Sequence, residues 1–320
     1  MQVLTTTMTA DDGSALAVHS WLPDGVTALG DPAESGERPR AVVQIAHGMA
    51  EHAGRYARFA AALVEAGFAV HADDHRGHGE SAEHTGLGYL GDGVGWDAVV
   101  DDLHTLLAWE KETYPGVPVI LLGHSWGSFL ARDVAIRFGS ELDGLIVMGT
   151  GGNPGVAGSA GKAIAESICR VKGEQHVSET LNQLSFGSFN KQFAPQRTEF
   201  DWLSRDHTEV EHYLADPRCG FTCSASFFRE MVAGVTRVNA RKNVALVPKN
   251  LPILLCSGAK DPVGDRGKGV RQVATQYRRA GITDVAMTLY AGARHEILNE
   301  VNRDQVTRDI LAWIEAHLRA

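Results

Sequence analysis

Residues 117–127 read VPVILLGHSWG, and this stretch decides the expected fold. A short, almost wholly apolar run that ends at a glycine is typical of a strand buried in a parallel sheet. The pattern Gly-x-Ser-x-Gly follows at 123–127, where its glycines allow the strand and the next helix to approach closely. We therefore predict a strand-turn-helix unit that holds Ser125 on a strained turn, with its hydroxyl exposed as a nucleophile.

Strand-like and helix-like segments alternate on both sides of this unit. Further short apolar runs bounded by glycine or proline predict strands at 41–46, 68–72, 143–148, 251–257 and 285–290. Apolar residues spaced three and four positions apart predict helices around 99–107, 129–138 and 306–318, and another helix is expected near 267–280. This alternation predicts an α/β fold with a doubly wound, mostly parallel sheet.

Two regions depart from the alternation. Residues 2–9 and 14–21, joined across a short Asp-Asp-Gly turn, predict an antiparallel hairpin at the sheet edge, and a surface loop is expected at 23–40. Beyond residue 150 aromatic residues stand among polar ones without strand signals, which predicts a mainly helical cap. We expect a core formed by 1–150 and 246–320, with the cap inserted at 151–245.

Partners for the serine occur in the carboxy-terminal part of the chain. Asp261 lies just beyond the strand predicted at 251–257, and His295 lies just beyond the one at 285–290. Because the loops that follow parallel strands emerge at one edge of the sheet, both can converge on Ser125. The three residues are predicted to form a Ser-His-Asp triad, and Asp265 on the same loop is the rival for the acidic position.

A loop suited to stabilising an oxyanion follows the strand at 41–46. It reads HGMAEH over 47–52, and its glycine frees the backbone to direct amide groups inward. We predict that the amides of Met49 and Trp126 form the oxyanion hole. Glu51 and His52 are expected to order the loop.

Composition excludes several classes of function. The 320 residues carry 39 acidic and 30 basic side chains, a formal charge of -9 that disfavours nucleic acid as a partner. No basic stretch followed by an apolar core opens the chain, and no apolar run reaches membrane-spanning length. The four cysteines are interpreted as reduced thiols, so a cytoplasmic location is expected.

Metals and cofactors are not predicted. The chain has 14 histidines, including His71, His75 and His78, but no His-Glu-x-x-His pattern. The stretch 86–91 matches the dinucleotide fingerprint literally, yet it follows a polar loop and opens no helix. We expect a reaction that needs neither a metal nor a cofactor.

Four motifs resemble those of the monoacylglycerol lipase and lysophospholipase-like branch of the α/β-hydrolases. They are His47-Gly48 with Glu51-His52 and Arg55-Tyr56, the run from Asp74 to Ser81, the Ser125 motif at 123–127, and Ser257-Gly258 with Asp261-Pro262, Gly292 and His295. The resemblance implies an α/β-hydrolase fold and a serine hydrolase that cleaves a carboxylic ester of a monoacylglycerol, a lysophospholipid or a similar single-chain compound. Trp126, Ser128 and the cap depart from the better-known lipases, which leaves the substrate open.

The cap is expected to shape the acyl pocket. Most of its aromatic residues are predicted to bury its own small core, whereas Leu184, Phe189 and Phe228 are predicted to line the pocket. An apolar cap also suggests weak contact with a lipid surface and no stable insertion.

Other functions remain open at this stage, and one is acyl transfer to an alcohol or a peroxide, since the same acyl-enzyme serves either acceptor. A peptidase or amidase of the same fold would need an acidic patch for a free amine, for which the cap offers Glu166, Glu174, Glu199 and Glu209. A ligand-binding protein that has lost catalysis is a different class, and the complete set of triad residues disfavours it.

Overall fold

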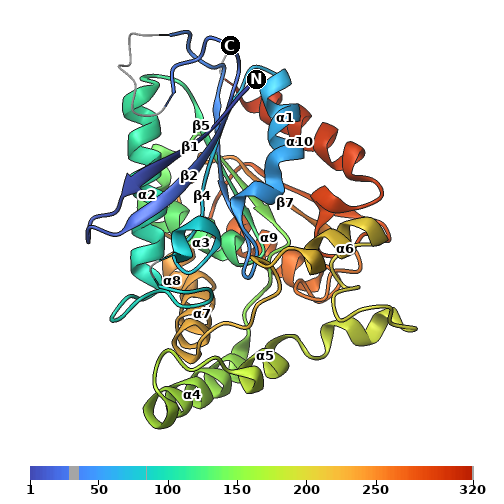
Figure 1. Ribbon diagram of the computed structural model, residues 1–320. Coiled ribbons are helices and arrows are strands. Elements are labelled where there is room, and N and C mark those ends of the chain that lie inside the picture. The colour runs from blue at the N-terminus through green and yellow to red at the C-terminus, as the bar shows by residue number, and fades with distance from the viewer. Residues whose placement is uncertain (29–35, 84, 319–320) are drawn as a thin grey trace.

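The computed structural model describes residues 1–28, 36–83 and 85–318, and it confirms the predicted doubly wound sheet (Figure 1). Eight strands lie in the order β1-β2-β4-β3-β5-β6-β7-β8. Their bounds are β1 Gln2–Thr9, β2 Ala15–Leu22, β3 Val42–Ala46, β4 Ala69–Asp73, β5 Val119–His124, β6 Gly144–Met148, β7 Ile253–Gly258 and β8 Val285–Tyr290. β2 pairs antiparallel with β1 and with β4, and the pairings from β4 to β8 are parallel.

The amino-terminal hairpin lies at the sheet edge, as expected from the sequence. β1 and β2 pair in register from Gln2 with Leu22 to Thr9 with Ala15. Gly13 closes the turn with a φ of 85°, a conformation that glycine adopts without steric cost. The loop predicted at 23–40 lies in part outside the described residues.

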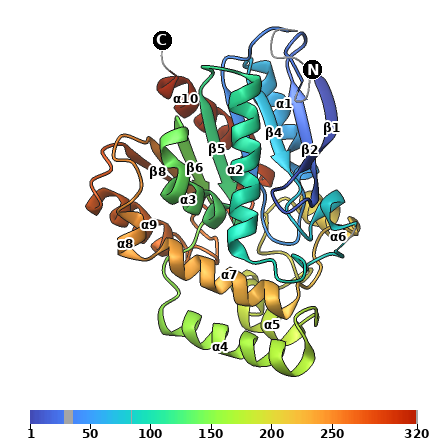
Figure 2. The same ribbon diagram turned by 90° about the vertical axis from the view of Figure 1, so that its left-hand side faces the viewer.

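Helices cover both faces of the sheet (Figure 2). Their bounds are α1 Ala57–Glu65, α2 Trp96–Thr113, α3 Trp126–Phe138, α4 Gly155–Lys172, α5 Glu179–Phe186, α6 His207–Ala215, α7 Ala225–Val238, α8 Arg241–Val244, α9 Lys268–Arg279 and α10 Arg303–His317. α1 and α10 contribute to one buried apolar cluster, and α2, α3 and α9 contribute to another on the opposite face.

The central strand β5 supplies side chains to both clusters. Ile120 and Leu122 belong to the cluster of α1 and α10, whereas Leu121 between them belongs to the cluster of α2 and α3. Because successive side chains of a strand point to opposite faces, a strand covered on both sides must be apolar throughout. This explains why the run before Ser125 has no polar alternation.

The segment predicted as a cap contains α4 to α8 and no strand of the sheet. Figure 1 shows α4, α5 and α7 beyond one end of the sheet, and α4 packs on α7. α7 in turn lies against the core, since a side chain at Gly234 would overlap the ring of Trp96. The boundaries 151 and 245 stay a prediction. None of the helices in the described ranges combines the length and hydropathy needed to span a bilayer.

Candidate active site

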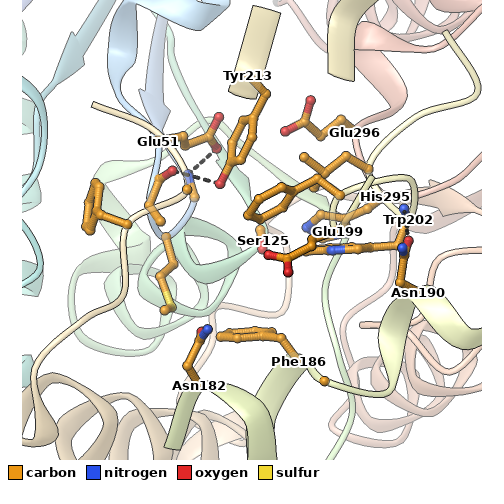
Figure 3. Close-up of a pocket in the computed structure, with 18 of the residues that line it drawn as sticks. Glu51, Ser125, Asn182, Phe186, Asn190, Glu199, Trp202, Tyr213, His295 and Glu296 are labelled. Atoms are coloured by element: carbon orange, nitrogen blue, oxygen red, sulfur yellow. Dashed lines mark hydrogen bonds between the residues drawn. The ribbon is translucent and has the colours of Figure 1, made fainter. Parts of the chain in front are cut away.

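Ser125 occupies the turn between β5 and α3. It is the single residue between these elements, with φ 52° and ψ −118°. Such a conformation is strained for a residue with a side chain, and the surrounding structure must hold it in place. The amide of Ser125 donates to the carbonyl oxygen of Met148 at the end of β6, at 2.9 Å. The side chain of Ser125 thereby faces a cavity (Figure 3).

The two glycines of the turn are required by packing. A Cβ atom at Gly127 would overlap the carbonyl oxygens of Ala46 and His47, and a Cβ at Gly123 would overlap the carbonyl oxygen of Gly127. α3 therefore lies directly against the carboxyl ends of β3 and β5. This is the close approach that the Gly-x-Ser-x-Gly pattern predicts.

His295 and Asp261 meet beside Ser125, although they lie on the loops after different strands. Nδ1 of His295 lies 3.0 Å from Oδ1 of Asp261, and both side chains are buried. The carboxylate also accepts hydrogen bonds from the hydroxyl of Ser257 (3.0 Å) and the amide of Val263 (2.9 Å). Asp265, the rival for this position, is exposed and pairs with Lys268 instead.

Asp261 also sets the basicity of His295. Burial alone would lower the pKa of this imidazole, but the charge of Asp261 and the hydrogen bond to it raise the pKa above its ordinary value of 6.5. The ring of His295 contacts the rings of His124 and Trp202, with centroid distances of 4.8 and 5.1 Å. An imidazole held in this way can remove a proton from a hydroxyl and return it to a leaving group.

The loop 47–52 lies against the serine. A Cβ atom at Gly48 would stand 3.2 Å from the Cβ of Ser125, and Met49 lines the same cavity. The amides of Met49 and Trp126 donate no hydrogen bond to any described residue. Both donors therefore remain available near Ser125 for an oxygen that becomes negatively charged.

Cap residues support this loop. The carbonyl oxygen of Ala50 accepts hydrogen bonds from the hydroxyl of Tyr213 (2.9 Å) and the amide of Gly220 (3.0 Å). His52 Nε2 lies 2.8 Å from a carboxylate oxygen of Asp216. The cap therefore holds the loop that carries Met49.

A buried ionic network, which the sequence did not indicate as part of the site, lies beneath the cavity. Glu51 accepts hydrogen bonds from the amide of Gly48 (2.6 Å), from Arg55 (2.7 Å) and from the hydroxyl of Tyr56 (2.9 Å). Nδ1 of His124 lies 3.1 Å from the same carboxylate. Burial alone would raise the pKa of Glu51, but His124 and Arg55 hold it well below its ordinary value, so this carboxylate is ionised.

The cavity has a volume of about 320 Å³ and lies between the sheet and the cap. Apolar and aromatic side chains form part of its wall: Met49, Phe186, Phe200, Trp202, Leu203, Tyr213 and Phe221. Polar side chains of the cap form another part: Asn182, Gln183, Asn190, Lys191, Gln196 and Glu199. A pocket with an apolar wall and a polar wall suits a substrate that combines an acyl group with a hydroxylated group.

The structure corrects the predicted acyl pocket, since Leu184, Phe189 and Phe228 do not line the cavity. Leu184 is 63% exposed, because α5 turns Phe186 toward the cavity and a residue two positions away lies on the other side of a helix. Phe189 packs against Phe186 and Trp202, and Phe228 is buried against Phe227. Phe189 and Phe228 therefore pack behind the side chains that form the pocket wall.

Within the described ranges, one group of side chains has the geometry for a metal ion. Ligand atoms of His52, Asp216 and Cys219 lie within 4.8 Å of one another. His52 and Asp216 already share the hydrogen bond that ties the loop to the cap. The histidines considered from sequence have other contacts: His75 lies 2.7 Å from Asp73, and His71 lies 2.8 Å from the hydroxyl of Ser20.

Known proteins resemble this chain in sequence and in fold. Residues 37–302 match the family model described as serine aminopeptidase, S33. The chain is 30% identical to the monoacylglycerol lipase of Mycolicibacterium smegmatis over 88% of this chain and 90% of that protein. It is 28% identical to the human monoglyceride lipase over 95% of this chain and 88% of that protein. A thermostable carboxyl esterase from Bacillus coagulans, solved with glycerol, superposes with a TM-score of 0.89 at 30% identity, and each chain is covered completely.

Proposed function

The chain belongs to the serine aminopeptidase S33 family of α/β-hydrolases, and we propose that it hydrolyses single-chain carboxylic esters, monoacylglycerols first among them. One observation carries the proposal. Ser125 stands at a φ of 52° on the cavity wall beside His295, whose other ring nitrogen lies 3.0 Å from Asp261. A hydroxyl, a base and a carboxylate that orients the base are the groups that acyl transfer requires.

Acylation begins when Nε2 of His295 removes the proton of Ser125. Oγ of the serine attacks the ester carbonyl, and the amides of Met49 and Trp126 stabilise the negative oxygen of the tetrahedral intermediate. The bond to the alcohol then breaks, and His295 returns its proton to the leaving oxygen. The products of this half-reaction are a free alcohol and an acyl group on Ser125.

Deacylation repeats the same steps with water as the nucleophile. His295 removes a proton from water, the hydroxide attacks the acyl carbonyl, and the two amides again hold the oxyanion. Collapse of the intermediate releases the carboxylic acid and restores the hydroxyl of Ser125. Asp261 keeps the imidazole in the tautomer that both half-reactions need.

The cavity supports an ester with a small hydroxylated leaving group. Phe186, Trp202 and Phe221 offer an apolar surface for the acyl chain, and Asn182 offers hydrogen bonds for hydroxyl groups. The matched lipases of Mycolicibacterium smegmatis and human act on monoacylglycerols by name, and the Bacillus coagulans esterase was solved with glycerol. Glycerol is therefore the leaving alcohol that we propose.

The test is a substrate panel measured under one set of conditions. It contains monoacylglycerols of increasing acyl length, lysophosphatidylcholine, p-nitrophenyl esters and an amino-acid anilide. The proposal predicts ester turnover with a defined optimum of acyl length and faster turnover of monoacylglycerol than of lysophosphatidylcholine. Turnover of the anilide alone would reject it, and so would the absence of turnover on every ester.

An aminopeptidase is the second candidate, because one carboxylate of the cap lines the cavity beside the ion-paired Glu51 and Glu296. Of the four acidic cap residues considered from sequence, Glu199 is a lining residue. Glu166, Glu174 and Glu209 lie outside the lining and pair with Lys162, Arg229 and Arg58, respectively. A single exposed carboxylate is a weak receptor for an amine, so the anilide in the panel is expected to be a poor substrate.

Weak contact with a lipid surface forms part of the proposal. An exposed apolar stripe runs along α4, and its members are Val156, Ala160, Ala163, Ile164 and Val171. These positions recur at helical spacing on one face, as in helices that lie in a membrane interface. Sedimentation with phosphatidylcholine vesicles should weaken when Val156 and Val171 are both changed to Asp. Equal sedimentation of the variant would reject this contact.

We also place the protein in the cytoplasm. Cys169, Cys219, Cys223 and Cys256 are all free thiols, which suits a reducing compartment. Fractionation of cells that express the chain tests this location.

A further inference from the structure

His47 directly follows β3 and is fully buried at the start of the loop that carries Met49. Its ring stacks on the ring of His75 with a centroid distance of 4.0 Å and lies near the ring of His78 at 5.3 Å. The catalytic cycle described above makes no use of this imidazole. Its two ring nitrogens nevertheless contact two specific backbone groups.

The backbone contacts determine which nitrogen of His47 carries the proton. The amide of His75 donates to Nε2 of His47 at 3.0 Å, so Nε2 must be an acceptor. Nδ1 lies 2.7 Å from the carbonyl oxygen of Gly48, which can only accept, so Nδ1 must carry the hydrogen. A protonated ring would place an N–H group against the amide of His75. The neutral Nδ1–H tautomer is therefore the one that fits.

The surroundings of His47 agree with a neutral ring. Burial lowers the pKa of this imidazole well below 6.5, and the neighbouring His75 and His78 lower it further. Asp74 and Glu51 act in the opposite direction without reversing the effect. The ring thus keeps one donor and one acceptor across the pH range in which the enzyme works.

The carbonyl group held by His47 belongs to the peptide that contains the amide of Met49. In a planar trans peptide the C=O and N–H groups point to opposite sides, so holding the Gly48 oxygen turns the Met49 N–H away from the His47 ring. The preceding peptide is held as well, because the amide of Gly48 donates to Glu51 at 2.6 Å. The orientation of the Met49 amide is therefore set by the side chains of His47 and Glu51.

We propose that His47 is a positioning residue of the oxyanion hole: its Nδ1–H fixes the Gly48–Met49 peptide so that the Met49 amide points at the developing oxyanion. This proposal rests on the proposed function, which assigns that amide to the oxyanion. Without the hydrogen bond, the peptide can rotate about its flanking φ and ψ angles and turn the amide aside. A donor lost in this way affects the transition state and leaves substrate binding nearly intact.

Two substitutions test the contacts of the two ring nitrogens of His47 separately. In His47→Asn the side-chain amide nitrogen takes the place of Nδ1, so the bond to the Gly48 oxygen can persist while the acceptor for His75 is lost. In His47→Gln the side-chain oxygen takes the place of Nε2, so the acceptor persists and the donor to Gly48 is lost. The control is His71→Gln, since His71 is also fully buried but bonds Ser20 on the far side of β4.

The measurements are kcat and KM on p-nitrophenyl butyrate, inhibition by an alkyl trifluoromethyl ketone, and the melting temperature. His47→Gln should lower kcat by about 10²- to 10³-fold, as expected for loss of one oxyanion donor, with KM changed less than about threefold. The ketone forms an alkoxide on the serine, so its inhibition constant should rise in parallel. His47→Asn should recover most of the lost kcat, and His71→Gln should keep it despite a lower melting temperature.

Three results would overturn the role of His47. They are an equal loss of kcat in the Asn and Gln variants, a loss in His71→Gln as large as that in His47→Gln, and a change confined to KM. Failure of the proposed function looks different, because the wild-type protein would then not hydrolyse the ester, or Ser125→Ala would hydrolyse it equally well.

Discussion

The guanidinium group of Arg55 donates two hydrogen bonds to the carboxylate of Glu296, at 2.6 and 2.7 Å, and a third to Glu51 at 2.7 Å. Glu296 directly follows His295, and Glu51 holds the loop that contains Met49. One buried cation therefore connects the loop of the base with the loop of the oxyanion hole. Loss of the Arg55 guanidinium should therefore lower both the stability and the activity of the protein.

Arg55→Met should lower the free energy of unfolding by about 3–5 kcal/mol, because two buried carboxylates lose their cation. Burial alone would raise the pKa of Glu296, but Arg55 holds it below its ordinary value of 4.5. The stabilisation is therefore present above pH 4.5 and is lost as the pH falls, so the deficit of the variant should shrink in acid. Urea unfolding at pH 7 and pH 4 measures both effects.

A matched control exists at the surface. Arg40 makes the same two-bond contact with Glu315, at 2.7 Å each, but the two side chains are 55% and 40% exposed. Arg40→Met should cost at most about 1 kcal/mol, because water screens the pair. An equal loss in the free energy of unfolding for the two variants would mean that burial does not strengthen the contacts of Arg55.

Asp261→Asn should lower kcat by about 10⁴-fold, since an amide does not hold the imidazole in the required tautomer. The pH profile should change as well. Asp261 raises the pKa of His295 above 6.5, so wild-type activity falls as the pH drops through a value above 6.5 and the base becomes protonated. In the variant burial dominates, and this acid limb should move to lower pH. Asp265→Asn is the control. A loss of kcat in this variant as large as that in Asp261→Asn would contradict the assignment of Asp261 as the triad carboxylate.

Phe186→Ala should shift the preferred acyl length and raise KM for monoacylglycerols, because it removes a ring from the cavity wall. Leu184 lies two positions away on α5, and its side chain is exposed. The kinetics of Leu184→Ala should therefore match those of wild type. A profile of rate against acyl length for both variants makes the comparison. An effect of Leu184→Ala as large as that of Phe186→Ala would show that α5 presents a different face to the substrate.

Gly127→Ala should prevent folding or cost several kcal/mol, since its Cβ would overlap the carbonyl oxygens of Ala46 and His47. Gly161→Ala is a suitable comparison. It lies within α4 with open space around it, and alanine there should stabilise the protein by about 0.5–1 kcal/mol. Thermal unfolding of both variants measures these changes in stability. A Gly127→Ala protein as stable as wild type would contradict the close contact between α3 and β3.

The sheet and the neighbours of Ser125 could be predicted from sequence because both depend on local patterns and on topology. Buried strands require unbroken apolar runs, and all loops after parallel strands emerge at one edge. Asp261 and His295 could therefore be paired although they lie 34 positions apart. Gly123 and Gly127 are also a local pattern, because they indicate that the strand and the helix approach each other closely.

The pocket wall and the network around Arg55 could not be predicted, because they depend on how the cap packs. Leu184 and Phe186 look equally apolar in sequence, and only the rotation of α5 decides which of them faces the cavity. Arg55 and Glu296 lie 241 positions apart, and nothing in the local sequence of either indicates the other.

The most direct test is the rate of monoacylglycerol hydrolysis by wild-type protein and by Ser125→Ala, with the acyl-enzyme trapped by acid quench and located by mass spectrometry. The substitution should lower kcat by about 10⁴-fold or more at an unchanged melting temperature, and the acyl group should be found on Ser125. Hydrolysis that persists in Ser125→Ala, or an acyl group on another residue, would contradict the assignment of Ser125 as the nucleophile.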